Sequence, residues 1–267
     1  MISQNHMNEW SRRRKRNVLL IVLFFLVVIV ALPLYFFFNV APTCFDNKQN
    51  GDETGVDCGG SCTALCTSQS LPLLLKGDPQ VLKVSTTTYE AVAYVENSNA
   101  TGQIRMADYT FKLYEASSSV PVKTITGSSF VPKNSRFLVF EGPFDMGDKV
   151  PTRATFEWDP ASIVWEKNTD PVPVINQADS GVTNASTTPR IDARISTTSL
   201  TPLSNIYLAV LVFDNTGTIQ AASKTYIDTL TNGDVVPAVF SWPSPFTFTP
   251  ASVEVISVVL PDSSYIK

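Results

Sequence analysis

The stretch YTFKLYE, from Tyr109 to Glu115, decides the fold class. Its aromatic and aliphatic side chains alternate with other residues at period two, which is the pattern of a β-strand with one buried face. A second stretch, IYLAVLVFD from Ile206 to Asp214, corresponds to it about 99 residues later. Other strands are predicted at Tyr89–Glu96, Arg136–Phe140, Thr152–Trp158, Arg190–Thr197 and Ala251–Val259, where β-formers lie between clusters of turn residues. Beyond about residue 70 the sequence therefore predicts an all-β protein without a long amphipathic helix.

The β-region is predicted to be a tandem repeat. Gly142–Phe144 has a counterpart in Ser244–Phe246, and each is followed by a proline and a strand. Each unit is about 100 residues long, which is the size of an immunoglobulin-like β-sandwich. We expect two such sandwiches, at residues 69–168 and 169–267, joined near Asn168–Pro173, where prolines disfavour helix and central strand.

The N-terminal part predicts a membrane anchor. Val18–Phe38 contains no charged residue and is long enough to cross a bilayer core about 30 Å thick. The residues before it are basic: Arg12, Arg13, Arg14, Lys15 and Arg16. Because basic flanks stay in the cytoplasm, we expect a cytoplasmic tail at residues 1–17, a transmembrane helix at residues 18–40 and an extracytoplasmic remainder. The alternative is a signal peptide cleaved near Val40–Ala41.

Charge and composition argue against nucleic-acid binding and against catalysis that depends on histidine. After residue 17 the chain carries 15 basic and 23 acidic residues, a net charge of −8, which disfavours nucleic acid as a partner. The single histidine, His6, lies before the anchor. The outer part therefore lacks the residue needed for Ser-His-Asp or Cys-His catalysis and for His-ligated zinc. We expect no enzyme activity.

A small cysteine-rich module is predicted at residues 41–68. It holds all the cysteines of the chain: Cys44, Cys58, Cys62 and Cys66. In an oxidising compartment these should form two disulfides, and three pairings are open. A zinc site of four thiolates is the alternative, although the spacing lacks the usual paired C-x2-C knuckles.

An acidic turn within this module offers ligands for calcium. Against a twelve-residue calcium loop, Asp46 takes position 1, Asn50 position 5 and Asp57 position 12. Lys48 occupies position 3, where an oxygen ligand belongs, so the alternative is a Gly-rich turn closed by disulfides. Apart from this calcium site, no cofactor is expected.

Two resemblances to known families follow from these motifs. Residues 44–66 resemble a module of the form C-x-D-x-x-x-N-G-x-E-T-G-V-D-C-G-G-x-C-x-x-C, which recurs in surface proteins of many microbes, with the last spacing one residue longer here. Phe111–Glu115 resembles the F-x-L-Y-D signature of FxLYD domains, small extracytoplasmic β-sandwiches, with Glu115 in place of the Asp. The first resemblance implies a surface location and the second a fold; neither implies an activity.

The sequence thus predicts a single-pass protein of the cell membrane whose outer part is a structural or protein-binding module. Its partners would be the lipid bilayer and other envelope or surface proteins. One alternative is an accessory subunit of a membrane complex or filament assembly, acting through its helix. The other is a carbohydrate-binding ectodomain, in which exposed rings of Trp158, Trp165 or Trp242 would stack on sugars.

Overall fold

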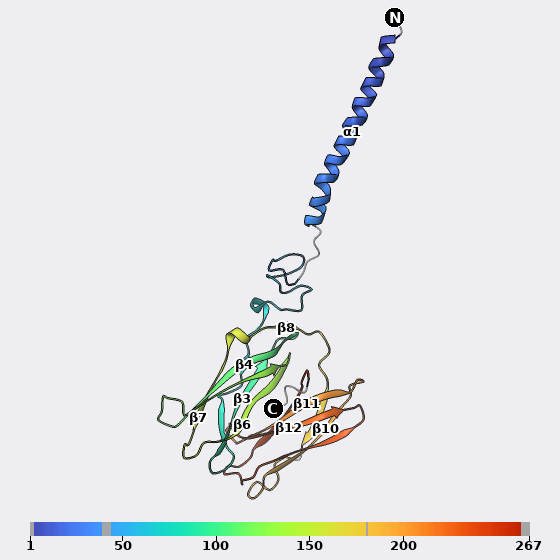
Figure 1. The fold of residues 1–267 in the computed structure, drawn as a ribbon. Helices are drawn as coiled ribbons and strands as arrows, with labels where there is room; N and C mark the ends of the chain where they lie inside the picture. Colours follow the sequence, from blue (N-terminus) through green and yellow to red (C-terminus); the bar gives the residue numbers. More distant parts are fainter. Residues whose placement is uncertain (1–2, 39–43, 180, 263–267) are drawn as a thin grey trace. The chain divides into compact units, whose positions relative to one another are not determined.

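The computed structural model of the chain describes residues 3–38, 44–179 and 181–262, without the side chains of residues 3–12 and 36–38 (Figure 1). The chain forms two compact units, Met1–Asp57 and Cys58–Lys267. The elements are α1 (Ser3–Phe38), η1 (Thr67–Gln69), β1 (Leu74–Leu75), β2 (Gln80–Lys83), β3 (Thr88–Asn97), β4 (Gly102–Tyr114), β5 (Lys123–Val131), β6 (Ser135–Asp145), β7 (Arg153–Trp158), η2 (Pro160–Ser162), β8 (Glu166–Lys167), β9 (Ile175–Asp179), β10 (Arg190–Thr197), β11 (Leu203–Phe213), β12 (Ile219–Leu230), β13 (Val235–Ser241) and β14 (Ser252–Val259). The prediction of a β-rich region behind one N-terminal apolar helix is confirmed.

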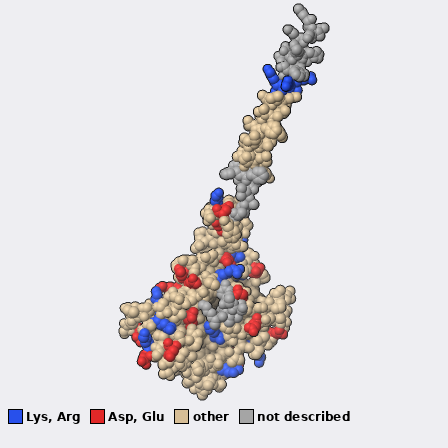
Figure 2. Space-filling view, viewed as in Figure 1, with Lys and Arg blue, Asp and Glu red and all other residues tan. Residues whose placement is uncertain are grey.

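The first unit contains the long helix α1, which continues through Pro33 to Phe38. Its segment Arg13–Tyr35 is long and apolar enough to cross a membrane. A signal sequence near an N-terminus has the same properties, so the helix itself does not distinguish an anchor from a leader. Figure 2 shows lysine and arginine side chains gathered at one end of the apolar segment. The side chain of Arg12 and all of residues 39–40, which the anchor prediction includes, lie outside the described residues.

The described residues of the second unit form four antiparallel sheets, which we name after their central strands. The β3 sheet joins β3 to β2 and β1 on one side and to β6 on the other, and the β4 sheet has the order β5-β4-β7. The β10 sheet has the order β13-β10-β9, and the β11 sheet the order β12-β11-β14. Strands β2 to β7 and strands β9 to β14 therefore repeat one connectivity: the first, second and fifth strands form one sheet, and the third, fourth and sixth form the other.

The β11 sheet is buried on both faces. Ile206, Leu208 and Val210 of β11 pack in one core together with Ile191 and Ile195 of the β10 sheet. The residues that alternate with them, Tyr207, Ala209 and Leu211, pack in a second core with side chains of the β3 and β4 sheets. Because successive side chains of a strand point to opposite faces, β11 belongs to two cores at once.

The β3 sheet is likewise an inner layer. Strand β3 is buried from Tyr89 to Val95 without a break. On one side, the Tyr94 hydroxyl donates a hydrogen bond to Glu254 of β14, at 2.5 Å. On the other, the Tyr109 hydroxyl of β4 donates to Glu141 of β6, also at 2.5 Å. The layers thus follow the order β4 sheet, β3 sheet, β11 sheet, β10 sheet, and the two halves share apolar packing.

Gly127 of β5 makes room for the hydrogen bond between the β4 and β3 sheets. It pairs directly with Tyr109, and a Cβ atom at Gly127 would lie 2.5 Å from the Tyr109 hydroxyl and 2.8 Å from a Glu141 carboxylate oxygen. A tyrosine ring beside a strand glycine compensates for the missing side chain of the glycine. Burial, followed by the hydrogen bond to Glu141, raises the pKa of Tyr109, so its hydroxyl stays a donor.

The connection between the halves is held by one buried ammonium group. Lys133, 8% exposed, donates from Nζ to the Asn168 carbonyl at 2.7 Å and to the Asn168 Oδ1 at 3.1 Å. It also donates to the Asp170 carbonyl. An ammonium has three protons to donate, and here each has an oxygen acceptor. The Asn168–Pro173 segment is therefore fixed at its start to the first half.

Candidate functional site

The three predicted calcium ligands are brought together in the turn of the first unit. The Asp57 carboxylate accepts hydrogen bonds from the backbone N–H groups of Asp46 and Asn47, each at 2.9 Å. The Asp46 carboxylate accepts from the Lys48 N–H and from the Asn50 side-chain amide. These bonds satisfy the backbone of a tight turn, while the Asn50 Oδ1 is buried without a hydrogen-bond partner among the described residues. Calcium binding at this turn stays a prediction.

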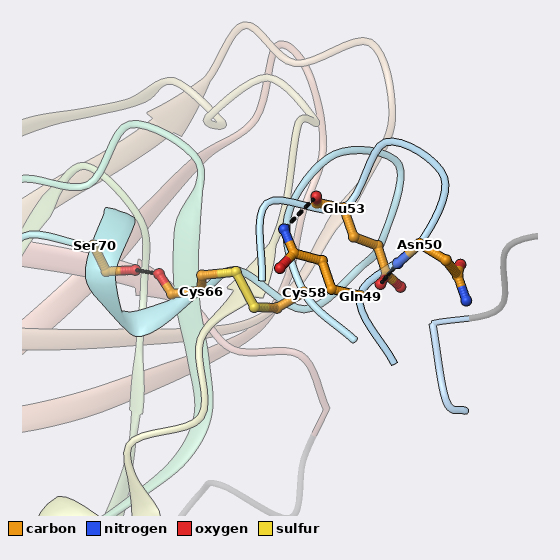
Figure 3. The surroundings of a disulfide bond; sticks show 6 residues. All are labelled: Gln49, Asn50, Glu53, Cys58, Cys66 and Ser70. Carbon is orange, nitrogen blue, oxygen red and sulfur yellow. Dashed lines mark hydrogen bonds between the residues drawn. A yellow bond between two sulfur atoms is a disulfide. The ribbon is translucent and has the colours of Figure 1, made fainter. Parts of the chain in front are cut away.

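The cysteines are all disulfide-bonded, which leaves no thiolate for the alternative zinc site. Of the pairings that the sequence left open, the structure contains the Cys58–Cys66 bond in the second unit (Figure 3). Next to it the Ser70 hydroxyl donates to the Cys66 carbonyl. In the first unit, Gln49 donates to the Glu53 carbonyl and the Asn50 N–H donates to the Glu53 carboxylate. Cross-links and turn contacts thus order a segment too short for a core of its own.

A groove of about 500 Å³ lies between the two halves of the second unit. Residues 80–86, including all of β2, line one side of it. The start of β12, from Ile219 to Ala222, and the loop from Trp242 to Phe248 line the other. A groove of this volume at the junction of the two halves is typical of a binding site.

The wall formed by the loop after β13 is aromatic. Trp242 and Phe246 meet edge-to-face with ring centroids 5.1 Å apart, and Phe246 and Phe248 stack at 4.7 Å. The Trp242 ring is held in place because its Nε1–H donates to the Ala222 carbonyl at 2.9 Å. Trp242 is buried, whereas Phe246 and Phe248 are partly exposed toward solvent.

Glu90 is the charged residue of the groove that is buried. Its side chain lines the groove from β3, it is 9% exposed, and no hydrogen bond to its carboxylate is found among the described residues. Burial raises the pKa of Glu90 to about 7, and the attraction of Lys224 opposes this rise only in part. Burial has this effect because it disfavours the charged form of a carboxyl group.

Two lysines lie near the groove, and Lys224 is the one whose charge acts on Glu90. Lys83 follows the residue that pairs with Glu90 in the sheet, and so it points to the opposite face. Lys83 of β2 is exposed and lines the same groove. Lys224 of β12 lines a separate cavity of about 70 Å³, with its Nζ 5.0 Å from the centre of the Phe140 ring. The buried Tyr207 hydroxyl, which has no hydrogen-bond partner among the described residues, lines this smaller cavity as well.

Trp158, Trp165 and Trp242, which the carbohydrate alternative would use, are half-buried or buried. Trp165 is 4% and Trp242 8% exposed. Trp158 is half-buried, and its ring lies edge-on against Phe156 at 4.8 Å. These three residues therefore contribute to packing.

Sequence reasoning missed the groove and Glu90. The signal available was one acidic residue inside the buried run from Tyr89 to Val95. It could be interpreted only once β3 was known to be buried on both faces, since an outward-facing glutamate is ordinary in a strand with one exposed face.

No family model and no curated protein matches the chain. Among solved structures, the crystal structure of red sea bream transglutaminase is similar over 72% of this chain, with 13% sequence identity and a TM-score of 0.22. The chain spans 31% of the length of that transglutaminase. A TM-score this low supports no inference about fold or activity.

Proposed function

We propose that this protein is a membrane-anchored extracytoplasmic module with a structural or protein-binding role and no catalytic activity. The observation that carries the proposal is the order of parts along the chain. A basic run precedes the apolar helix segment Arg13–Tyr35, and a disulfide-bonded all-β unit follows it. Basic flanks stay in the cytoplasm, and disulfides persist in oxidising compartments. The segments before and after the helix therefore predict the same orientation, with the N-terminus in the cytoplasm and the β-unit outside.

Two immunoglobulin-like sandwiches are the fold that this proposal includes. In immunoglobulin domains, strands A, B and E share one sheet, while C, F and, in variable-type domains, C′ share the other. The connectivity repeated in β2–β7 and β9–β14 follows that order. Such sandwiches expose edge strands, which bind partners by β-augmentation.

Orientation and anchoring are tested on the full chain in its native membrane. The protein should resist carbonate extraction, an N-terminal epitope tag should be protease-protected in intact cells, and Lys112 and Lys167, both outside α1, should react with an impermeant amine reagent. Release of a soluble chain lacking the N-terminal segment would show a cleaved leader and refute the anchor.

The binding role is tested by cross-linking in the same membrane. A variant whose segment Val18–Phe38 is replaced by an unrelated polyleucine helix serves as the comparison. Partners cross-linked to both forms support binding through the β-unit. Partners lost with the replaced helix would instead make the protein an accessory subunit that assembles through α1.

A further inference from the structure

We propose that the groove between β2 and the Trp242–Phe248 loop binds an extended polypeptide segment through a lysine or arginine side chain that docks against the Glu90 carboxylate. This rests on the proposed protein-binding function and names the chemistry of its partner. Three independent features of the groove support it: the carboxylate, the aromatic wall and the strand edge.

The carboxylate supplies a binding partner for a cation. Glu90 is nine-tenths buried, lines the groove and lacks a side-chain hydrogen bond among the described residues. The carboxylate oxygens of Glu90 are thus accessible from the groove within a largely desolvated side chain, where a hydrogen bond to a charged ligand contributes more than in water. Since carboxylates are acceptors, an ammonium or guanidinium group is the complementary ligand.

The aromatic wall suits the rest of such a side chain. Phe246 and Phe248 stack and remain partly exposed beside the groove. Lysine and arginine carry an apolar stem that packs on rings, and their charged ends are attracted to ring faces. An acidic partner side chain would gain from neither the wall nor Glu90.

The strand edge selects a polypeptide over a free small cation. β2 pairs with β3 on one side, and no strand among the described residues pairs with its other side. Residues 80–83 of this edge line the groove, and an added strand would pair with their outward N–H and C=O groups. Successive side chains of that strand would point alternately toward the groove and away from it.

Charge favours the same partner. The chain beyond residue 17 has a net charge of −8, which attracts basic segments over distance. Among the described residues, Lys224 is the charged group whose attraction acts on Glu90. Lys83 lines the groove from the rim but points to the other face of its sheet, and the Trp242–Phe248 loop carries no charged residue.

The test uses the full chain in detergent micelles and fluorescence anisotropy of labelled peptides TVKVT, TVQVT and TVEVT. We expect TVKVT to bind about tenfold or more tightly than TVEVT. Glu90→Gln should remove that preference, and Phe248→Ala should weaken binding of all three peptides. The matched control is Glu157→Gln, the same change at an exposed position of β7, which should leave binding unchanged.

The pH dependence gives a second readout. Because the cation binds the ionised carboxylate and the pKa of Glu90 is about 7, affinity for TVKVT should fall about tenfold from pH 8 to pH 6. Affinity of the Glu90→Gln variant should change little over this range. The native fold of each variant is checked by its circular dichroism spectrum, since the melting temperature of Glu90→Gln is itself expected to change.

Several results would overturn the proposal. Equal binding of TVKVT and TVEVT, or full binding by Glu90→Gln, would exclude the role of the carboxylate. Displacement of the peptide by lysinamide at the same concentration as by unlabelled TVKVT would show a site for a small cation. If native-membrane cross-links persist unchanged in Glu90→Gln and Phe248→Ala, the groove is not the contact, while the protein-binding function stands.

Discussion

Replacing Leu211 by alanine tests whether the two halves are one cooperative unit. Leu211 is completely buried, and it lies on the face of β11 that packs toward the first half. Truncating a buried leucine to alanine removes apolar contacts and leaves a cavity, at a cost of about 2–5 kcal/mol. For a unit of this size each kcal/mol lowers the melting temperature by roughly 2–4 °C, so the expected decrease is about 4–20 °C.

Leu200→Ala provides the matched control. It is the same substitution only three residues before β11, but Leu200 is 92% exposed, so we expect a change within about 0.5 kcal/mol. Leu208→Ala, which faces the β10 sheet, should be as destabilising as Leu211→Ala.

Calorimetry and hydrogen exchange on the full chain distinguish the outcomes. With a shared core, Leu211→Ala should shift one transition, and β4 and β10 should lose amide protection together. Two separate transitions, or a Leu211→Ala variant as stable as Leu200→Ala, would refute the continuous packing from the β3 sheet to the β11 sheet.

Three further predictions concern single contacts. The pKa of Glu90 is about 7 in the folded chain, against an ordinary value of 4.5, so its contribution to stability is present below pH 4.5 and is lost as pH rises toward 7. In denaturant titrations, the free energy of unfolding of Glu90→Gln should therefore rise by up to about 3 kcal/mol relative to that of the native chain between pH 4.5 and pH 8. If the difference in unfolding free energy between the two proteins stayed constant over this range, the burial of Glu90 would not raise its pKa as argued. Gly127→Ala should cost about 1–3 kcal/mol because the new methyl group meets the Tyr109 hydroxyl, and adding Tyr109→Phe should recover part of that loss in a double-mutant cycle, whereas strictly additive effects would not fit this clash. Lys133→Met should cost about 1–3 kcal/mol and raise amide exchange around Asn168; unchanged exchange there would show that the ammonium does not hold the connection.

The strands were predictable because their patterns are local. Alternation in Tyr109–Glu115 identified β4, and the continuous run Ile206–Phe213 identified β11. The difference between these two patterns also indicates how each strand is buried. A strand with one buried face alternates, whereas a strand buried on both faces does not, so β11 already showed the signature of an inner layer.

Other features depend on where distant segments meet. The cysteine spacing predicted two disulfides but could not select the Cys58–Cys66 pairing, since pairing depends on the path of the chain between them. The groove was not predictable for the same reason. It joins β2 to residues more than 130 positions later in the sequence, such as Trp242. No local pattern indicates that these two segments form opposite sides of one groove.

The double burial of β11 limits how this protein could have evolved and how it can be divided. A half excised at Asn168 would expose the apolar face that carries Tyr207, Ala209 and Leu211, and exposed apolar faces promote aggregation. If the two halves arose by duplication, the copies would no longer be interchangeable, because each half has one face that packs on the other. Shuffling a single half into another protein would require that face to be made polar first.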